Sequence, residues 1–122
     1  ILQNLFDEFE QLTHVKIKYS LASNIHWDEL DFNIKINLYR IFQEALTNIR
    51  KYAKAKRVNI EVFKKNNKIE FIIKDDGIGF NTQKTSDGIG IKNLKFRMHN
   101  LNGTLKISSS SEGTQIKGTI PN

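Results

Sequence analysis

The feature that most constrains the fold of this chain is a pair of alternating apolar runs, one on each side of a tight turn. Apolar side chains take every second position in residues 57–64 and again in residues 68–74, and they are Val58, Ile60, Val62, Ile69, Phe71 and Ile73. A period of two is typical of strands that bury one face. Asn66 and Asn67, between the two runs, favour a tight hairpin turn. The sequence therefore predicts an antiparallel hairpin whose apolar face must be covered by a second layer.

Helical spacing, strand alternation and turn residues divide the rest of the chain into further elements. Asp31 or Asn33 can cap a long helix that runs to about residue 54, and Gly103 ends a later one. We expect helices over residues 1–12, 31–54 and 91–100, a loop over 23–31, and strands over 14–21, 57–64, 68–74, 104–109 and 114–120. Hairpins with helices gathered on one face predict an α+β fold, a two-layer sandwich with a mixed, mostly antiparallel sheet.

Length and residue usage narrow the class of protein. The 122 residues fit a single domain spanning 1–122. No apolar run approaches the roughly 20 residues that cross a bilayer, and the N-terminus lacks the basic start and apolar core of a signal peptide. The missing initiator Met suggests a piece of a longer protein. The absence of cysteine excludes disulfide frameworks, thiolate zinc sites and cysteine nucleophiles.

The formal net charge of +6 indicates an anionic partner. A nucleotide, a nucleic acid, an anionic lipid or an acidic protein would each suit it, and charge alone does not choose among them. Nucleic acid is the least favoured, because the lysines are scattered along the sequence and aromatic residues are not interleaved with them as a stacking platform requires.

The long helix carries a polar stripe. At about 100° per residue, Arg40, Glu44, Asn48 and Lys51 share one side. The opposite side is apolar and must face the sheet; it comprises Leu38, Ile41, Phe42, Ala45, Leu46, Ile49, Tyr52 and Ala53. Asn48 can offer an oxygen to Mg²⁺, Glu44 can hold or activate a water, and Lys51 can neutralise phosphate charge. The alternative interpretation is a solvated face with ion pairs such as Arg40–Glu44.

Glycines cluster in the segment that follows the central hairpin. Four of the seven, namely Gly77, Gly79, Gly88 and Gly90, fall between residues 77 and 90. Glycine lets the backbone approach a ligand closely, and exposed N–H groups where a helix begins suit a phosphate. Asp75 and Asp76 directly follow the strand, and a carboxylate there could accept a hydrogen bond from an exocyclic amine, which would favour adenine over guanine. A simple Asp-Gly turn is the alternative, but two glycine pairs around a short polar loop favour a ligand-covering lid.

Four segments resemble, in the right order, the motifs of sensor histidine kinases. Residues 43–53 resemble the N-box in the form found in the branch of DesK-like and nitrate-sensor kinases, although that branch usually has His where Tyr52 stands. Residues 75–80 and 88–98 resemble the two glycine boxes, and residues 112–121 resemble the closing Gly-Thr strand. The resemblance covers residues 38–121 and implies a Bergerat-type fold with an ATP lid, as in gyrase, Hsp90 and MutL.

The resemblance also implies roles for individual residues. Asn48 is the expected Mg²⁺ ligand, Glu44 the catalytic or water-orienting acid, and Lys51 a phosphate contact. Asp75 is the expected acceptor of the adenine amine, and Thr114 is expected near the adenine. The implied nucleotide-binding residues are Asn48, Lys51, Tyr52, Asp75, Gly77, Gly79, Gly88, Ile89, Gly90 and Thr114.

In such a kinase the domain binds ATP and Mg²⁺ and donates the γ-phosphate to a His on a separate dimerisation domain, which relays it to a response regulator. His14, His26 and His99 lack the context of that acceptor, so we expect them to be structural or exposed. The resemblance implies a bacterial cytoplasmic domain whose parent can be membrane-anchored. It also implies a homodimeric full-length protein, a monomeric fragment and no nucleic-acid partner.

Two other interpretations remain at this point. One keeps the fold but changes the acceptor, as in an anti-sigma-factor serine kinase or another ATPase of the gyrase, Hsp90 and MutL group. The other is a degenerate nucleotide-binding module that acts only in docking. The presence of both Glu44 and Asn48 argues against degeneracy.

Overall fold

The structure is a computed structural model that describes residues 2–78 and 89–121. In chain order its elements are α1 (Leu2–Thr13), β1 (Lys16–Leu21), the short 3₁₀ turn η1 (Trp27–Glu29), α2 (Phe32–Asn48), the π-helical turn η2 (Ile49–Ala53), β2 (Arg57–Lys65), β3 (Lys68–Asp75), α4 (Ile89–Asn100), β4 (Thr104–Ser110) and β5 (Gly113–Pro121). Each helix and strand expected from the sequence is present.

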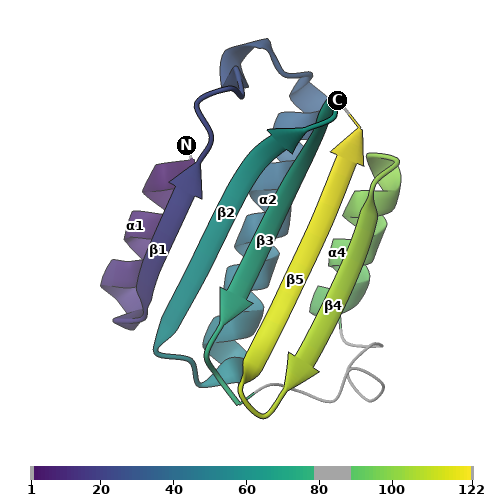
Figure 1. The fold of residues 1–122 in the computed structure, drawn as a ribbon. Helices are drawn as coiled ribbons and strands as arrows, with labels where there is room; N and C mark the ends of the chain where they lie inside the picture. The colour runs from purple at the N-terminus through teal and green to yellow at the C-terminus, as the bar shows by residue number, and fades with distance from the viewer. Residues whose placement is uncertain (1, 79–88, 122) are drawn as a thin grey trace.

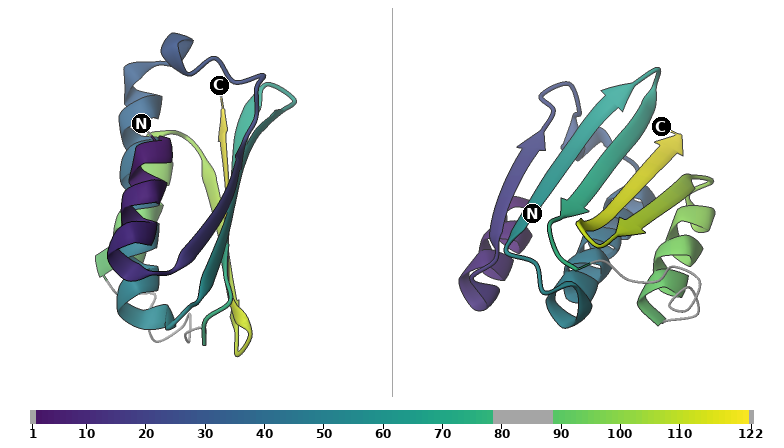
Figure 2. Two further views of the ribbon diagram at one scale, coloured as in Figure 1. Left: turned by 90° about the vertical axis from the view of Figure 1, so that its left-hand side faces the viewer. Right: turned by 60° about the horizontal axis from the view of Figure 1, so that its bottom comes forward.

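The strands form one five-stranded sheet in the order β1-β2-β3-β5-β4. β1 pairs in parallel with β2, whereas the other three pairings are antiparallel. The three long helices cover one face of this sheet and leave the other uncovered (Figures 1 and 2). The expectation of an α+β two-layer sandwich with a mixed, mostly antiparallel sheet is therefore confirmed.

The core lies between the two layers. The alternating residues of β2 and β3 point into it, so that Val58, Ile60, Ile69, Phe71 and Ile73 are at most 1% exposed. Aromatic contacts join the layers, with the ring of Phe42 in α2 lying 5.6 Å from Phe6 in α1 and 5.4 Å from Phe71 in β3. This continuous apolar contact fixes α2 against the middle of the sheet.

Asparagine and aspartate side chains shape the turns as their chemistry favours. Asp31 caps α2 by accepting a hydrogen bond from the backbone N–H of Asn33 at 2.7 Å. Asn66 and Asn67 both have positive φ, 53° and 60°, as a tight hairpin turn with the right-handed strand twist requires. α4 ends at Asn100, as predicted, but Asn102 and not Gly103 takes the left-handed conformation after it, at φ 55°.

The long helix departs from its expected form in its last turn. Its α-helical part ends at Asn48, and residues Ile49–Ala53 form a π-helical turn that stops at Lys54, whose φ of 52° is left-handed. A π-turn has more residues per turn than an α-helix. The spacing of about 100° per residue that placed Lys51 in line with Glu44 and Asn48 therefore does not hold beyond Asn48.

Candidate functional site

Asp75 is a buried carboxylate at the end of β3. Its exposed fraction is 4%, and its Oδ1 accepts a hydrogen bond from the Gly77 backbone N–H at 2.9 Å. Burial raises the pKa of Asp75 above its usual value of 3.8, and the charge of Asp76 adds to that effect. Backbone hydrogen bonds from Gly77 and Thr114 act in the opposite direction. A buried acid with a shifted pKa is typical of a binding or catalytic site.

The neighbouring Asp76 makes hydrogen bonds that hold the backbone together. Its Oδ1 accepts hydrogen bonds from the backbone N–H groups of Lys56 at 2.8 Å and Arg57 at 2.9 Å. The hydrogen bond from Arg57, followed by that from Lys56, lowers the pKa of Asp76. Asp76 thus ties the segment after β3 to the start of β2, and this leaves Asp75 to face the site.

Two glycines allow the backbone to pack closely around Asp75. A Cβ on Gly77 would lie 2.1 Å from the carbonyl oxygen of Ala53, the same oxygen that accepts a 2.8 Å hydrogen bond from the N–H of Ile78. Gly113 has a φ of 135°, and a Cβ there would lie 2.0 Å from the carbonyl oxygen of Asp75. Both positions exclude a larger residue, so the glycines set the spacing of the strands and helix that surround Asp75.

The polar stripe of α2 ends beside these residues. Glu44 is half-buried, and its Oε1 accepts a hydrogen bond from Asn93 Nδ2 in α4 at 3.4 Å. Asn48 is half-buried at the last α-helical position, and its side chain makes no hydrogen bond to any residue in the described part of the chain. Lys51 and Arg40 are exposed, Lys51 in η2 and Arg40 near the middle of α2. The amide of Asn48 is thus available to a ligand.

These residues gather at one end of the molecule. The last turn of α2, the end of β3, the start of β5 and the start of α4 all lie at the lower end in Figure 1. This end therefore holds Glu44, Asn48, Lys51, Asp75, Gly77 and Thr114 of the predicted site. Thr114, 5% exposed, shares a hydrogen bond with Ser109 at 3.0 Å between the two hydroxyl oxygens.

Five further predicted positions are described only in part or not at all. Gly79 and Gly88 lie outside the residues that the structure describes. Ile89 and Gly90 are seen as the first residues of α4, in agreement with a helix start there. The backbone of Tyr52 lies in η2, while its side chain is outside the described part.

Asn93 and Arg97 lie within the motif of residues 88–98, but their contacts with α2 were not predicted, and buried Asn37 was not singled out. Arg97 Nη1 donates to Asn37 Oδ1 at 3.5 Å, and Arg97 Nε is buried with no hydrogen-bond partner among the described residues. Asn93 and Arg97 are four residues apart on one helix, a spacing that places both on one face. That signal was visible in the sequence, but their partners on α2 were not, because they are distant in the chain.

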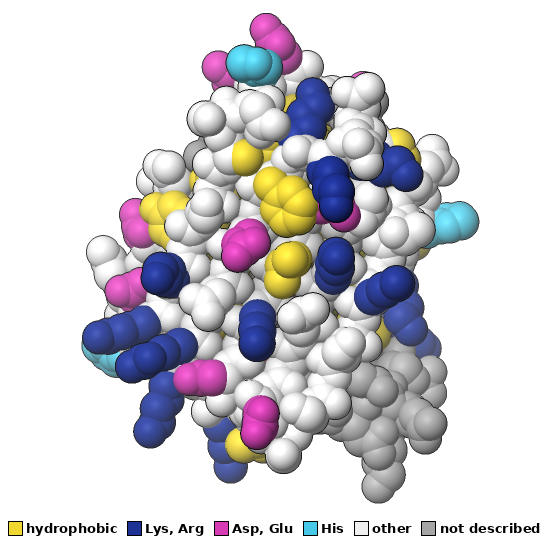
Figure 3. Space-filling model, viewed as in Figure 1, with side chains coloured by type: hydrophobic (Ala, Val, Ile, Leu, Met, Phe, Trp, Pro, Cys, Tyr) yellow, Lys and Arg dark blue, Asp and Glu magenta, His cyan; other side chains and the backbone are white. Residues whose placement is uncertain are grey.

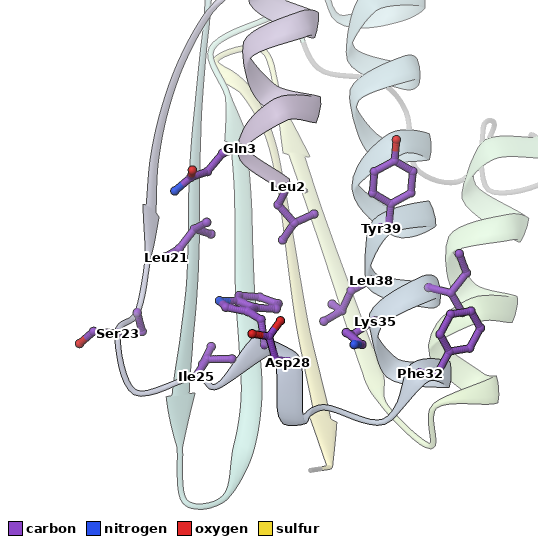
Figure 4. A pocket seen from close by; sticks show the side chains of 13 residues that line it. Leu2, Gln3, Leu21, Ser23, Ile25, Asp28, Phe32, Lys35, Leu38 and Tyr39 are labelled. Atoms are coloured by element: carbon purple, nitrogen blue, oxygen red, sulfur yellow. The ribbon is translucent and has the colours of Figure 1, made fainter.

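A large cavity lies elsewhere in the described part of the molecule. It has a volume of about 720 Å³ and is lined mainly by apolar residues such as Leu21, Trp27, Phe32 and Leu38 (Figure 4). These residues belong to the end of β1, to η1 and to the first half of α2, at the opposite end of the molecule from Asp75. No predicted site residue lines this cavity, so it is separate from the candidate site.

Other kinds of site find no support in the described residues. His14, His26 and His99 are all exposed, as expected. Across residues 2–78 and 89–121, His, Cys, Asp and Glu side chains form no group of three or more that could hold a metal ion. Within the same ranges, the helices are too short or too polar to cross a membrane.

Comparison with known proteins supports the resemblance found in the sequence. Residues 33–122 match the family described as histidine kinase-, DNA gyrase B- and HSP90-like ATPases. The signal transduction histidine-protein kinase/phosphatase DegS of Brevibacillus brevis is 38% identical over 91 residues, which cover 73% of this chain and 24% of DegS. The sensor histidine kinase ComP of Bacillus subtilis is 38% identical over 94 residues, covering 75% of this chain and 12% of ComP.

Solved structures show the same fold. The histidine kinase domain of a blue-light-activated histidine kinase from Erythrobacter litoralis superposes with a TM-score of 0.84 at 14% identity, covering 98% of this chain and 58% of that one. The histidine kinase AdeS of Acinetobacter baumannii gives a TM-score of 0.79 at 16% identity, over 98% of this chain and 60% of that one. The chain spans only 12 to 33% of the length of the five curated relatives compared.

Proposed function

The chain belongs to the family of histidine kinase-, DNA gyrase B- and HSP90-like ATPases, and on this basis we propose that it is the domain of a two-component sensor histidine kinase that binds Mg²⁺–ATP and donates its γ-phosphate. The observation that carries the proposal is the buried carboxylate of Asp75, which lies at the same end of the molecule as Glu44 and Asn48 of α2.

Asp75 supplies the base selectivity in this proposal. An adenine amine would donate to the Asp75 carboxylate, whereas the carbonyl at the same position of guanine would face it with an acceptor. Because Asp75 is 4% exposed, water is poorly placed to compensate for that mismatch. The Gly77 and Thr114 N–H groups hold the carboxylate in a fixed orientation. The site therefore favours ATP over GTP.

The polar residues along α2 and η2 suit the triphosphate part of the nucleotide. A Mg²⁺ ion takes oxygen ligands and keeps several waters and phosphate oxygens, and the Asn48 amide, which has no described partner, can provide one such oxygen. When bound, the ion neutralises charge on the phosphates. Lys51, exposed in η2, can approach the phosphates, and Glu44, oriented by Asn93, can hold a water or the incoming acceptor group.

The names of the curated relatives support a proposal for the acceptor and the partners. DegS and ComP bear the names of histidine kinases, which favours a histidine acceptor over the serine of an anti-sigma-factor kinase. We propose that this histidine lies on a dimerisation domain of the same protein and that a response regulator receives the phosphate. A cytoplasmic location, a homodimeric full-length protein and a monomeric fragment complete the proposal.

The test supplies the acceptor separately. The chain is mixed with the dimerisation domain of its full-length protein and with γ-labelled ATP and Mg²⁺. Transfer of an acid-labile, alkali-stable label to that domain supports the proposal, because phosphohistidine has this stability. An acid-stable label would indicate a serine acceptor, and no label with a folded acceptor domain would contradict the kinase assignment.

A further inference from the structure

The face of the sheet opposite the helices is rich in cations. Strand alternation places every second residue of each strand on this face, and its exposed cations include Lys16, Lys18, Arg57, Lys74, Lys106 and Lys117. We call these residues the basic sheet face. Figure 3 shows it from the front, with Lys and Arg side chains distributed over all parts of the sheet. Lysines that appear scattered in the sequence are therefore gathered by the fold.

The strand register sets several of these cations directly opposite one another. Lys16 lies opposite Arg57 across β1 and β2, and Lys106 lies opposite Lys117 across β4 and β5. Like charges at opposite positions destabilise a sheet. No lysine of the basic sheet face forms a salt bridge within the part of the chain that the structure describes. A bound anionic surface would relieve this repulsion.

The centre of the same face holds apolar and acidic side chains. Phe63 and Ile72 are half-buried there, with Phe63 opposite Glu70 and Ile72 opposite Glu61. A nucleic-acid strand needs a continuous basic track with aromatic side chains on which successive bases stack. Here a single aromatic ring lies beside carboxylates in the middle of the sheet, so the arrangement does not provide such a track. A lipid surface instead needs distributed cations and a few apolar side chains at the interface.

We propose that the basic sheet face binds the surface of an anionic lipid bilayer. The cations lie against the headgroups, and Phe63 and Ile72 contact the interface between them. The helices lie on the other side of the sheet, and the Asp75 end lies at one edge, so that membrane contact leaves the candidate nucleotide site accessible (Figure 2). This inference does not depend on nucleotide binding or on the kinase assignment.

The test measures flotation of the 122-residue chain with lipid vesicles. The chain should float with vesicles of phosphatidylcholine and phosphatidylglycerol, but not with phosphatidylcholine alone, and added salt should release it. Reversing two cations, Lys18→Glu with Lys74→Glu, should weaken binding by more than about tenfold, since each basic residue near such a surface contributes about 1 kcal/mol.

A matched control separates this face from net charge. Lys92→Glu with Lys95→Glu changes the charge by the same amount on α4, where both residues are exposed, and it should bind within about twofold of the unaltered chain. Urea unfolding curves of both variants, compared with that of the unaltered chain, check that they are folded. Equal losses in the two variants, or no flotation with anionic vesicles, would overturn the proposal. Release of the chain from vesicles by a single-stranded oligonucleotide at equal charge concentration would assign the face to nucleic acid instead.

Discussion

Asn93 in α4 donates a hydrogen bond from Nδ2 to Oε1 of Glu44 in α2, with 3.4 Å between the two atoms. A second contact, from Arg97 to Asn37, runs parallel to it further along the same two helices. The helix that begins directly after the glycine-rich segment is thus joined to the helix that carries the candidate catalytic acid. Asn93 is the residue on α4 that can orient Glu44.

Replacing Asn93 with Ala should slow phosphoryl transfer more than it weakens nucleotide binding. Loss of one modest hydrogen bond costs about 0.5–1.5 kcal/mol, so kcat for autophosphorylation of the full-length protein should fall roughly 2- to 12-fold with KM for ATP nearly unchanged. Asn93→Asp should be at least as damaging, because two carboxylates would then face each other. Asn100→Ala, at the exposed end of the same helix, is the control. A rise in KM without a fall in kcat would show that Asn93 does not act through Glu44.

Asp75→Asn should weaken ATP binding while leaving the domain folded. A hydrogen bond to a charged group contributes about 1.5–3 kcal/mol, so the Kd should rise roughly 10- to 150-fold, and the preference for ATP over GTP should shrink. Fluorescence titration with a labelled nucleotide measures both. Asp28→Asn, exposed at the other end of the molecule, should bind as the unaltered chain does. An unchanged Kd in Asp75→Asn would remove Asp75 from the site.

The pKa shifts of Asp75 and Asp76 predict opposite effects of pH on stability. The folded state raises the pKa of Asp75 above 3.8, so Asp75 loses its proton at a lower pH in the unfolded chain than in the folded one. Its contribution to the free energy of unfolding is therefore present below about 3.8 and is lost as pH rises through the folded-state pKa. Without nucleotide, Asp75→Asn should therefore gain stability relative to the unaltered chain as pH rises from about 3.8. Urea unfolding at a series of pH values measures the difference, and a difference independent of pH would contradict the buried carboxylate.

Asp76→Asn should show the reverse dependence. The folded state lowers the pKa of Asp76 below 3.8, so its contribution to stability is present above that value and is lost as pH falls through the folded-state pKa. The variant should be less stable at neutral pH, by a small amount because the side chain is largely in solvent, and it should match the unaltered chain in acid. If Asp76→Asn is still less stable than the unaltered chain below the folded-state pKa, the cause is the altered hydrogen-bond geometry of the side chain and not the loss of its charge.

Gly77→Ala should damage the site and the fold together. Its Cβ would lie 2.1 Å from the carbonyl oxygen of Ala53, so the backbone would have to shift, at a cost of about 1–3 kcal/mol. We expect the Tm to fall by at least about 4 °C and the ATP affinity to fall with it. Ser111→Ala, in the exposed turn between β4 and β5, is the control for a small change at a surface turn. An unaltered Tm would mean that the close contact with Ala53 is relaxed in solution.

Local patterns were enough to predict most of the fold. The alternation of Ile60 and Val62, and of their partners Ile73 and Phe71 on β3, is enough to predict two half-buried strands. Asn66-Asn67 is enough to predict the turn between them. The capping role of Asp31 is equally local. The parallel pairing of β1 with β2 was not predicted, because it depends on a crossover through α2 that no short pattern encodes.

The candidate site was predictable to a similar degree. Motif order identified Glu44, Asn48 and Asp75, and the structure places all three at one end of the molecule. The π-helical turn that carries Lys51 was missed, since the sequence of Ile49–Ala53 keeps the apolar spacing of an ordinary helix. The contact of Asn93 was not predicted, because its partner Glu44 lies far away in the chain. The roles of all the site residues, those of Gly79 and Gly88 included, stay predictions.

Calorimetric titration of the 122-residue chain with ATP in saturating Mg²⁺ tests the central claim most directly. The account predicts a saturable heat for one nucleotide per chain, with affinity strongly reduced in Asp75→Asn and also when the metal is chelated. The absence of binding heat from the folded chain, together with no displacement of a labelled nucleotide, would contradict a Mg²⁺–ATP site between α2 and the end of β3.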